Sequence, residues 1–333
     1  MIIKGSTYKP TLKSVEAAAN SLKGITAVTP LLKNETYSEK FDSNIFLKRE
    51  DLQKVRSYKI RGAYNKIVNL TPTQLTNGIV CASAGNHAQG VALSCFKLGV
   101  KGTIFVPETT PLQKLERILW FGKEQIELKL HGSTFDDANT KAINYANKHN
   151  KTFIPPFDDE KIIEGQATIA LELIAQAENP IDYLFIPVGG GGLAAGVSEI
   201  FKLMSPKTKL IGVEPDGAAS MSLSFTNNCV TTLKQISKFV DGASVKRVGK
   251  LNYEICKNNL SEMITVKDHE ICKCIIDLYN NDAIVAEPAG ALSIAALDSY
   301  KNFIKGKNIV CILSGSNNDL NRMEEIKFKA KNS

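Results

Sequence analysis

The sequence predicts an α/β protein built on open, twisted, mainly parallel sheets with helices on both faces. Two observations predict this fold class. Short apolar segments alternate with amphipathic helical segments along most of the 333 residues, and the apolar segments are nearly uninterrupted. Strands that are buried on both faces have this composition, and parallel strands need helical crossovers. A hydrophobic content of 43% is sufficient for one large domain or two medium ones.

The individual elements follow from the same patterns. Each strand is a run of β-branched, aromatic or other apolar residues, and most are followed by a segment with helical spacing of its apolar residues. In chain order we expect strand 79–83 with helix 86–98, strand 102–107 with helix 112–121, strand 126–130 with helix 135–149, strand 183–188 with helix 193–203, and strands 209–214 and 308–313. Two prolines and two aspartates at 155–159 interrupt the alternation, which indicates two sheet domains with a cleft between them.

Composition excludes several classes of function. The formal net charge is +7, but the lysines are scattered, so no nucleic-acid partner is expected. No apolar run of membrane-spanning length occurs, so no membrane association is expected. The seven cysteines are an odd set and several lie in apolar runs, which indicates reduced, buried thiols in a cytoplasmic protein. Neither Cys272 with Cys274 nor the four histidines have metal-ligand spacing, so no metal is expected.

Lys59 is the first candidate for chemistry. It follows Ser57 and Tyr58 at a predicted helix start, where Ser57 is expected to cap the helix. The positive field of a helix N-terminus, together with burial, favours a neutral amine over an ammonium ion. A neutral lysine amine can form a Schiff base, although most lysines are simply solvated.

A glycine run provides the second candidate site. Gly189, Gly190, Gly191 and Gly192 follow strand 183–188 and open a helix, so their backbone amides can hold a phosphate. A reactive amine and a phosphate site together are what a pyridoxal phosphate enzyme needs. The alternative is a dinucleotide-binding loop, in which Gly189, Gly191 and Ala194 match the fingerprint loosely and Glu214 contacts a ribose. That alternative describes a nicotinamide-dependent oxidoreductase and leaves Lys59 without a role.

A third segment, residues 83–90, links a strand to a helix. Its small residues and free amides are suited to a carboxylate, and Asn86 can donate to an oxygen of a cofactor ring. His87 invites a general-base interpretation, but a histidine in the first turn of a helix is more often structural.

These motifs together resemble the serine/threonine dehydratases, pyridoxal phosphate enzymes of the tryptophan synthase β-like fold. The resemblance rests on residues 48–53 with 57–63, on 83–90, on 189–192, on 239–243, on 286–291 and on 313–319, and it covers the chain in order. The chain is most similar to the biosynthetic threonine dehydratases, through the segment 317–323. The resemblance implies a large cofactor-binding domain of residues 1–56 and 157–333, a small domain of residues 57–156, and a homodimer or homotetramer.

The resemblance also implies a role for each site residue. Lys59 carries the cofactor covalently and moves the substrate α-proton, while Tyr58 packs at the cofactor ring in place of the family's usual phenylalanine. Asn86 contacts the ring oxygen, and Ser314 faces the pyridine nitrogen. The phosphate lies on the amides of Gly189, Gly190, Gly191, Gly192 and Leu193, and the substrate carboxylate lies among Ser83, Ala84, Gly85, Asn86 and His87.

The implied reaction converts L-threonine to 2-oxobutanoate and ammonia, with L-serine to pyruvate as a side activity, in isoleucine biosynthesis. The alternatives within the fold are serine dehydratase, serine racemase, threonine synthase and a sulfhydrylase. Ala84 stands where racemases have a serine base, which disfavours racemisation. Ser220 replaces the second acid of a family cation site at Glu214 and Ala218, so no metal is expected there. Because the sequence stops at Ser333, we expect no regulatory domain and no inhibition by isoleucine.

Overall fold

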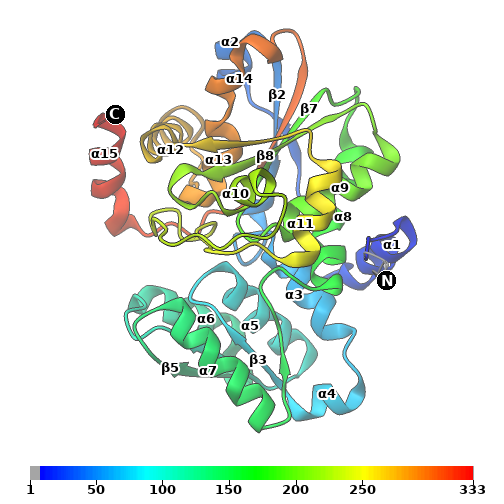
Figure 1. Ribbon diagram of the computed structural model, residues 1–333, viewed down its shortest axis with the longest axis vertical. Helices are drawn as coiled ribbons and strands as arrows, with labels where there is room; N and C mark the ends of the chain where they lie inside the picture. The colour runs from blue at the N-terminus through cyan, green and yellow to red at the C-terminus, as the bar shows by residue number, and fades with distance from the viewer. Residues whose placement is uncertain (1–7, 333) are drawn as a thin grey trace.

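Two sheets organise the chain, one of six strands and one of four, in a computed structural model that describes residues 8–332 (Figure 1). The six-stranded sheet has the order β1-β2-β10-β7-β8-β9, and only its edge pair β1·β2 is antiparallel. Its strands are β1 (Leu31–Lys33), β2 (Asn44–Arg49), β7 (Tyr183–Pro187), β8 (Lys209–Pro215), β9 (Glu262–Val266) and β10 (Asn308–Leu313). The mainly parallel arrangement is the one that the sequence predicted.

The four-stranded sheet is wholly parallel, with the order β5-β4-β3-β6. Its strands are β3 (Ile79–Ala82), β4 (Gly102–Val106), β5 (Ile126–Leu130) and β6 (Thr152–Phe153). Alternate residues of β3 serve two cores: Ile79 and Cys81 pack with residues of α5 (Asn86–Leu98) and α6 (Leu112–Gly122). Val80 and Ala82 pack instead against α7 (Phe135–Lys148). Burial on both faces explains why every residue of β3 is apolar.

The six-stranded sheet is covered in the same way. Leu184 and Ile186 of β7 pack with α8 (Glu160–Gln176) and α9 (Gly192–Met204), while Phe185 packs with α12 (Asp268–Asp282) and α13 (Pro288–Ala295). The remaining helices are α1 (Leu12–Leu22), α2 (Glu35–Phe41), α3 (Lys59–Val68), α4 (Pro72–Asn77), α10 (Ser220–Thr226), α11 (Lys250–Asn259), α14 (Leu297–Ile304) and α15 (Met323–Lys331). Among the described residues, no helix is both long and apolar enough to cross a membrane.

The predicted strands and helices agree with the observed ones to within one or two residues at each end. One local prediction is wrong. Helix α3 begins at Lys59 as expected, but the N-cap residue is Tyr58, and no side chain caps this helix. Ser57 instead forms an isolated bridge with Gly315, which lies two residues beyond the end of β10.

A buried ion network anchors α3 to the six-stranded sheet. Arg61 of α3 donates to both carboxylate oxygens of Glu50 at 2.7 and 2.8 Å and to both of Glu172 at 2.6 and 2.9 Å. Lys48 of β2 donates to the same Glu172 at 2.6 Å. Lys48, Glu50 and Arg61 are at most 1% exposed. The network therefore fixes the helix that carries Lys59, two residues before Arg61.

Breaking this network is expected to destabilise the fold strongly. Replacing Arg61 by alanine leaves the buried Glu50 carboxylate without its ion-pair partner and leaves Glu172 paired with Lys48 alone, and breaking a buried pair typically costs about 3–5 kcal/mol of the free energy of unfolding. The matched control is Lys305→Ala, which removes an ion pair to Asp42 whose side chains are 74% and 75% exposed. Such a surface pair contributes at most about 1 kcal/mol. Urea denaturation followed by circular dichroism measures the free energy of unfolding of each variant. Equal losses of this free energy in the two variants would show that the buried network is no more important for stability than the surface pair.

Candidate active site

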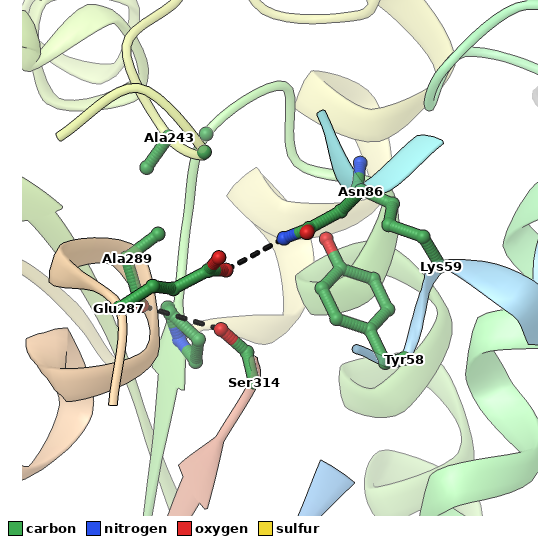
Figure 2. A pocket seen from close by; sticks show the side chains of 10 residues that line it. Tyr58, Lys59, Asn86, Ala243, Glu287, Ala289 and Ser314 are labelled. Atoms are coloured by element: carbon green, nitrogen blue, oxygen red, sulfur yellow. Dashed lines mark hydrogen bonds between the residues drawn. The ribbon is translucent and has the colours of Figure 1, made fainter. Parts of the chain in front are cut away.

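The candidate site lies where strands of the two sheets end. A cleft of about 800 Å³ contains Lys59, residues 83–87 after β3, Gly190 after β7, and Glu287. A small pocket at its base is lined by Tyr58, Lys59, Asn86, Pro187, Gly189, Gly242, Ala243, Glu287, Ala289 and Ser314 (Figure 2). Carboxyl ends of parallel strands are the usual place for a ligand in α/β folds, and the cleft has the volume of a small-molecule site. The structure thus brings together the three segments that the sequence singled out.

Lys59 is the first residue of α3, and its side chain lies at the boundary of the pocket and the cleft. Its amine donates to the backbone carbonyl of Pro156 at 3.1 Å, and no carboxylate pairs with it among the described residues. Burial lowers the pKa of Lys59 from 10.5 to about 8, although the nearby carboxyl of Glu287 acts in the opposite direction. A lysine of this kind is partly neutral near pH 7, as a nucleophilic amine must be.

The lowered pKa of Lys59 predicts how its reactivity depends on pH. With a pKa of about 8, about one amine in ten is neutral at pH 7 and nearly all are neutral at pH 9. The rate at which cofactor-free protein reacts with pyridoxal phosphate should therefore rise about tenfold between pH 7 and pH 9 and then level off. Stopped-flow absorbance measures this rate, with a lysine peptide as the control for ionisation of the aldehyde reagent. A rate that keeps rising through pH 10 would contradict the lowered pKa.

The glycine run supplies free backbone donors. Among the described residues, no protein oxygen accepts a hydrogen bond from the amides of Gly189 to Leu193. The amides of Gly192 and Leu193 belong to the first turn of α9, where helix geometry leaves N–H groups without intrahelical partners. A Cβ at Gly190 would lie 2.2 Å from the ring of Phe157, so the loop also has no room for a side chain there. A set of unpaired amides at a helix N-terminus is suited to a phosphate.

The loop after β3 presents small residues to the cleft. Ser83, Ala84, Gly85, Asn86 and His87 all line it, and the hydroxyl of Ser83 accepts from the amide of Gly85 at 3.2 Å. The ring of His87 is 4% exposed, and its Nε2 lies 3.1 Å from the carbonyl oxygen of Ile154. Burial lowers the pKa of His87 to about 3, so the ring is neutral. This environment favours the structural interpretation of His87 over a general base.

Tyr58 and Ser314 complete the pocket. The ring of Tyr58 extends into it between Asn86 and Ser314, and the Lys59 amine lies 5.3 Å from the ring centroid (Figure 2). Ser314 follows β10 directly and is 3% exposed. Its hydroxyl donates to the carbonyl of Ala289 at 3.2 Å, so its oxygen lone pairs remain available to the pocket.

Glu287 and Asn317 were missed as site residues, although both lie in segments that the resemblance quoted. Glu287 is 4% exposed and lies in the pocket, where its Oε1 accepts from the Asn86 amide at 2.6 Å (Figure 2). Burial raises the pKa of Glu287 to about 7. Asn317 donates to the Asn86 side-chain oxygen at 2.7 Å. These contacts join segments more than 200 positions apart. The only local signal in the sequence is the acidic residue directly before Pro288, at the start of α13.

Glu214 is engaged within the protein. Its carboxylate is fully buried and accepts from the amides of Met221 and Ser222, at 2.6 and 2.8 Å, and from the Ser222 hydroxyl at 2.7 Å. The carboxylate therefore caps α10, and neither of its oxygens is directed at a ribose. The oxidoreductase alternative required such a contact.

The expectation that no metal is needed at Glu214 remains a prediction. Because three protein donors already satisfy this carboxylate, strong chelation with EDTA should change the turnover rate by less than about twofold. The measurement compares the rate before chelation, after chelation, and after Mg²⁺ or Ca²⁺ is restored. A large loss that either cation reverses would contradict the prediction.

Comparisons with known proteins agree with this site. The family described as pyridoxal-phosphate dependent enzyme matches residues 22–315. The biosynthetic L-threonine dehydratase IlvA of Halalkalibacterium halodurans is 51% identical over 319 residues, which are 96% of this chain and 77% of that protein. The enzyme of the same name from Staphylococcus aureus is 50% identical over 330 residues, with 97% and 78% covered. The solved structure of processed threonine deaminase isoform 2 from Solanum lycopersicum has a TM-score of 0.91 at 37% identity and covers 100% of this chain and 93% of that one.

Proposed function

The chain belongs to the family of pyridoxal-phosphate dependent enzymes, and we propose that it removes water from L-threonine by β-elimination, giving 2-oxobutanoate and ammonia. The observation that carries the proposal is the combination in one cleft of a lysine with a lowered pKa and a run of unpaired amides. The two curated relatives, which are named biosynthetic L-threonine dehydratases, support threonine as the substrate. By the same likeness, the product feeds isoleucine biosynthesis, and L-serine is a slower substrate giving pyruvate.

The residues present fit pyridoxal phosphate. The unpaired amides of residues 189–193 would hold its phosphate, and the Lys59 amine would make the covalent link. Asn86 would contact the ring oxygen, Ser314 would lie at the ring nitrogen, and Tyr58 would pack against the ring. When bound, the cofactor supplies an electron sink for the electron pair left on the substrate α-carbon.

The protein's own residues would orient the substrate and move its proton. Free amides and small side chains at residues 83–87 would bind the substrate carboxylate at the N-terminus of α5. The Lys59 amine, which lines both the pocket and the cleft, would accept the substrate α-proton. The β-hydroxyl then leaves as water, and the released enamine is hydrolysed to the 2-oxo acid and ammonia. Each turnover loses one water and consumes one, with no net oxidation.

Racemisation is the main alternative within the fold. It needs a second proton-transfer group on the face of the substrate α-carbon opposite Lys59. In the loop after β3, which lines the cleft, this chain has Ala84 next to Ser83. An alanine has no proton to exchange, which favours elimination.

The substrate assignment is tested by comparing kcat/KM for L-threonine and L-serine with cofactor-loaded protein. The expected result is a higher kcat/KM for L-threonine, with 2-oxobutanoate as the product identified by chromatography. A higher value for L-serine would move the assignment to a serine dehydratase, and formation of D-serine without pyruvate would move it to a racemase.

We further propose that the enzyme works in the cytoplasm as a homo-oligomer. All seven cysteines are free and six are buried, which is typical of a reducing compartment. The proposed domains, 57–156 and 1–56 with 157–333, agree with the assignment of β3 to β6 to one sheet and of the other strands to the second.

A further inference from the structure

The side-chain amide of Asn86 has an orientation that follows from hydrogen bonding alone. The chain of contacts starts at the backbone carbonyl of Val55, which can only accept, so the Asn317 nitrogen must face it, at 2.9 Å. The second hydrogen of that nitrogen points to Asn86 at 2.7 Å, and therefore meets the Asn86 oxygen. The Asn86 nitrogen is consequently turned to the other side, where it donates to Glu287 at 2.6 Å (Figure 2).

Glu287 is held in place from a second direction. Its other oxygen accepts from the backbone amide of Asn317 at 3.2 Å, so one residue contacts both Glu287 and Asn86. The carboxylate also lies closely against Gly315, where a Cβ would be 2.5 Å from the Glu287 Oε1 atom. A glycine at this position therefore makes room for the carboxylate. Asn86, Glu287, Gly315 and Asn317 thus form one connected set of contacts.

The arrangement limits what Asn86 can offer to a ligand. Its oxygen accepts from Asn317, and one of its two hydrogens is donated to Glu287. The second hydrogen remains, and Asn86 lines both the pocket and the cleft. Asn86 can therefore act toward a ligand as a hydrogen-bond donor, and this suits an ionised ring oxygen.

We propose that Glu287 and Asn317 are positioning residues that lock the Asn86 amide with its N–H toward the cofactor. The inference rests on the proposed function, because it takes the ligand of Asn86 to be the ring oxygen of pyridoxal phosphate. It concerns how the cofactor is held, which is measured without any substrate.

The isosteric variant Asn317→Asp tests the lock. Aspartate has no N–H to give to Val55 or to the Asn86 oxygen, so the Asn86 amide turns to donate to residue 317 and no longer donates to the cofactor. Loss of one hydrogen bond to a charged acceptor should raise the dissociation constant of pyridoxal phosphate about tenfold, measured by equilibrium dialysis of loaded enzyme. The visible absorption maximum should shift in the same direction as in Asn86→Ala.

Two comparisons separate positioning from a merely structural role. Asn321→Asp adds the same charge four residues later, at an exposed side chain that does not line the cleft, and should leave the dissociation constant within about twofold of the wild-type value. The double variant Asn86→Ala/Asn317→Asp should bind the cofactor no more weakly than Asn86→Ala alone, because Asn317 acts through Asn86. An unchanged spectrum and affinity in Asn317→Asp, or losses that add in the double variant, would overturn the proposal.

If Asn317→Asp does not fold, Glu287→Gln provides the same test. A glutamine amide must turn its nitrogen toward either Asn86 or the Asn317 amide, so one donor faces another and the lock is weakened. The expected changes in affinity and absorption have the same direction and a smaller size, and wild-type values would overturn the proposal. Wild-type protein that binds the cofactor as described but does not turn over threonine would overturn the proposed reaction and leave the lock intact.

Discussion

Replacing Lys59 by alanine is expected to reduce turnover at least about a thousandfold, because proton transfer by a positioned side chain alone contributes about 10²–10⁴-fold and the covalent link is lost as well. The absorption band of the lysine-linked cofactor should be lost and that of the free aldehyde should take its place, while the backbone amides of residues 189–193 still bind the phosphate weakly. Absorbance spectroscopy and an assay of 2-oxo acid formation measure the two effects on one preparation.

The control for this variant is Lys54→Ala, which removes an exposed lysine five positions earlier. Its absorbance and turnover should remain at the wild-type level. Lys59→Ala with normal absorbance and normal turnover would exclude Lys59 as the residue that carries the cofactor.

Replacing Gly191 by alanine is expected to cause the second large loss. Gly191 has a φ angle of +92°, which L-residues rarely adopt, and a Cβ there would lie 2.7 Å from Met221 Cε and 2.9 Å from Asn252 Cβ. Strain of this kind costs about 1–3 kcal/mol, and the loop can relieve it only by moving its amides away from the phosphate position. The dissociation constant of pyridoxal phosphate should rise at least about tenfold.

The matched control is Gly306→Ala. Gly306 also has a positive φ, of +68°, but no atom lies within 4 Å of the position of its Cβ, and it lies between α14 and β10, outside the cleft. Both variants should lose thermal stability, whereas only Gly191→Ala should lose affinity for the cofactor. Equal cofactor affinities in the two variants would show that the glycine run does not hold the phosphate.

Much of the fold could be predicted from local sequence patterns. The strands Ile126–Leu130 and Asn308–Leu313 and the helix Asn86–Leu98 were predicted with the bounds observed, because each is a short apolar or helical run ended by turn residues. Local patterns of this kind do not predict the order of the strands within a sheet. β10 lies between β2 and β7, and its pairing with β2 joins residues more than 260 positions apart.

The site was predictable where one segment carries the chemistry. Lys59, the glycine run and the loop at residues 83–87 each contain a local signal, and the structure places all three at one cleft. The roles of Glu287 and Asn317 arise only from contacts between distant segments, so no local pattern revealed them. Serine is a common helix N-cap residue, but Ser57 forms a β-bridge with the distant Gly315, and this long-range contact overrides the local preference.

The central claim is a redox-neutral elimination from L-threonine in the cleft that contains Lys59. The measurement that tests it most directly is the amount of ammonia and of 2-oxobutanoate formed from L-threonine by protein loaded with pyridoxal phosphate, with no nicotinamide present. We expect equal amounts of the two products. Formation of 2-oxobutanoate only after a nicotinamide cofactor is added, or no 2-oxobutanoate under either condition, would contradict it.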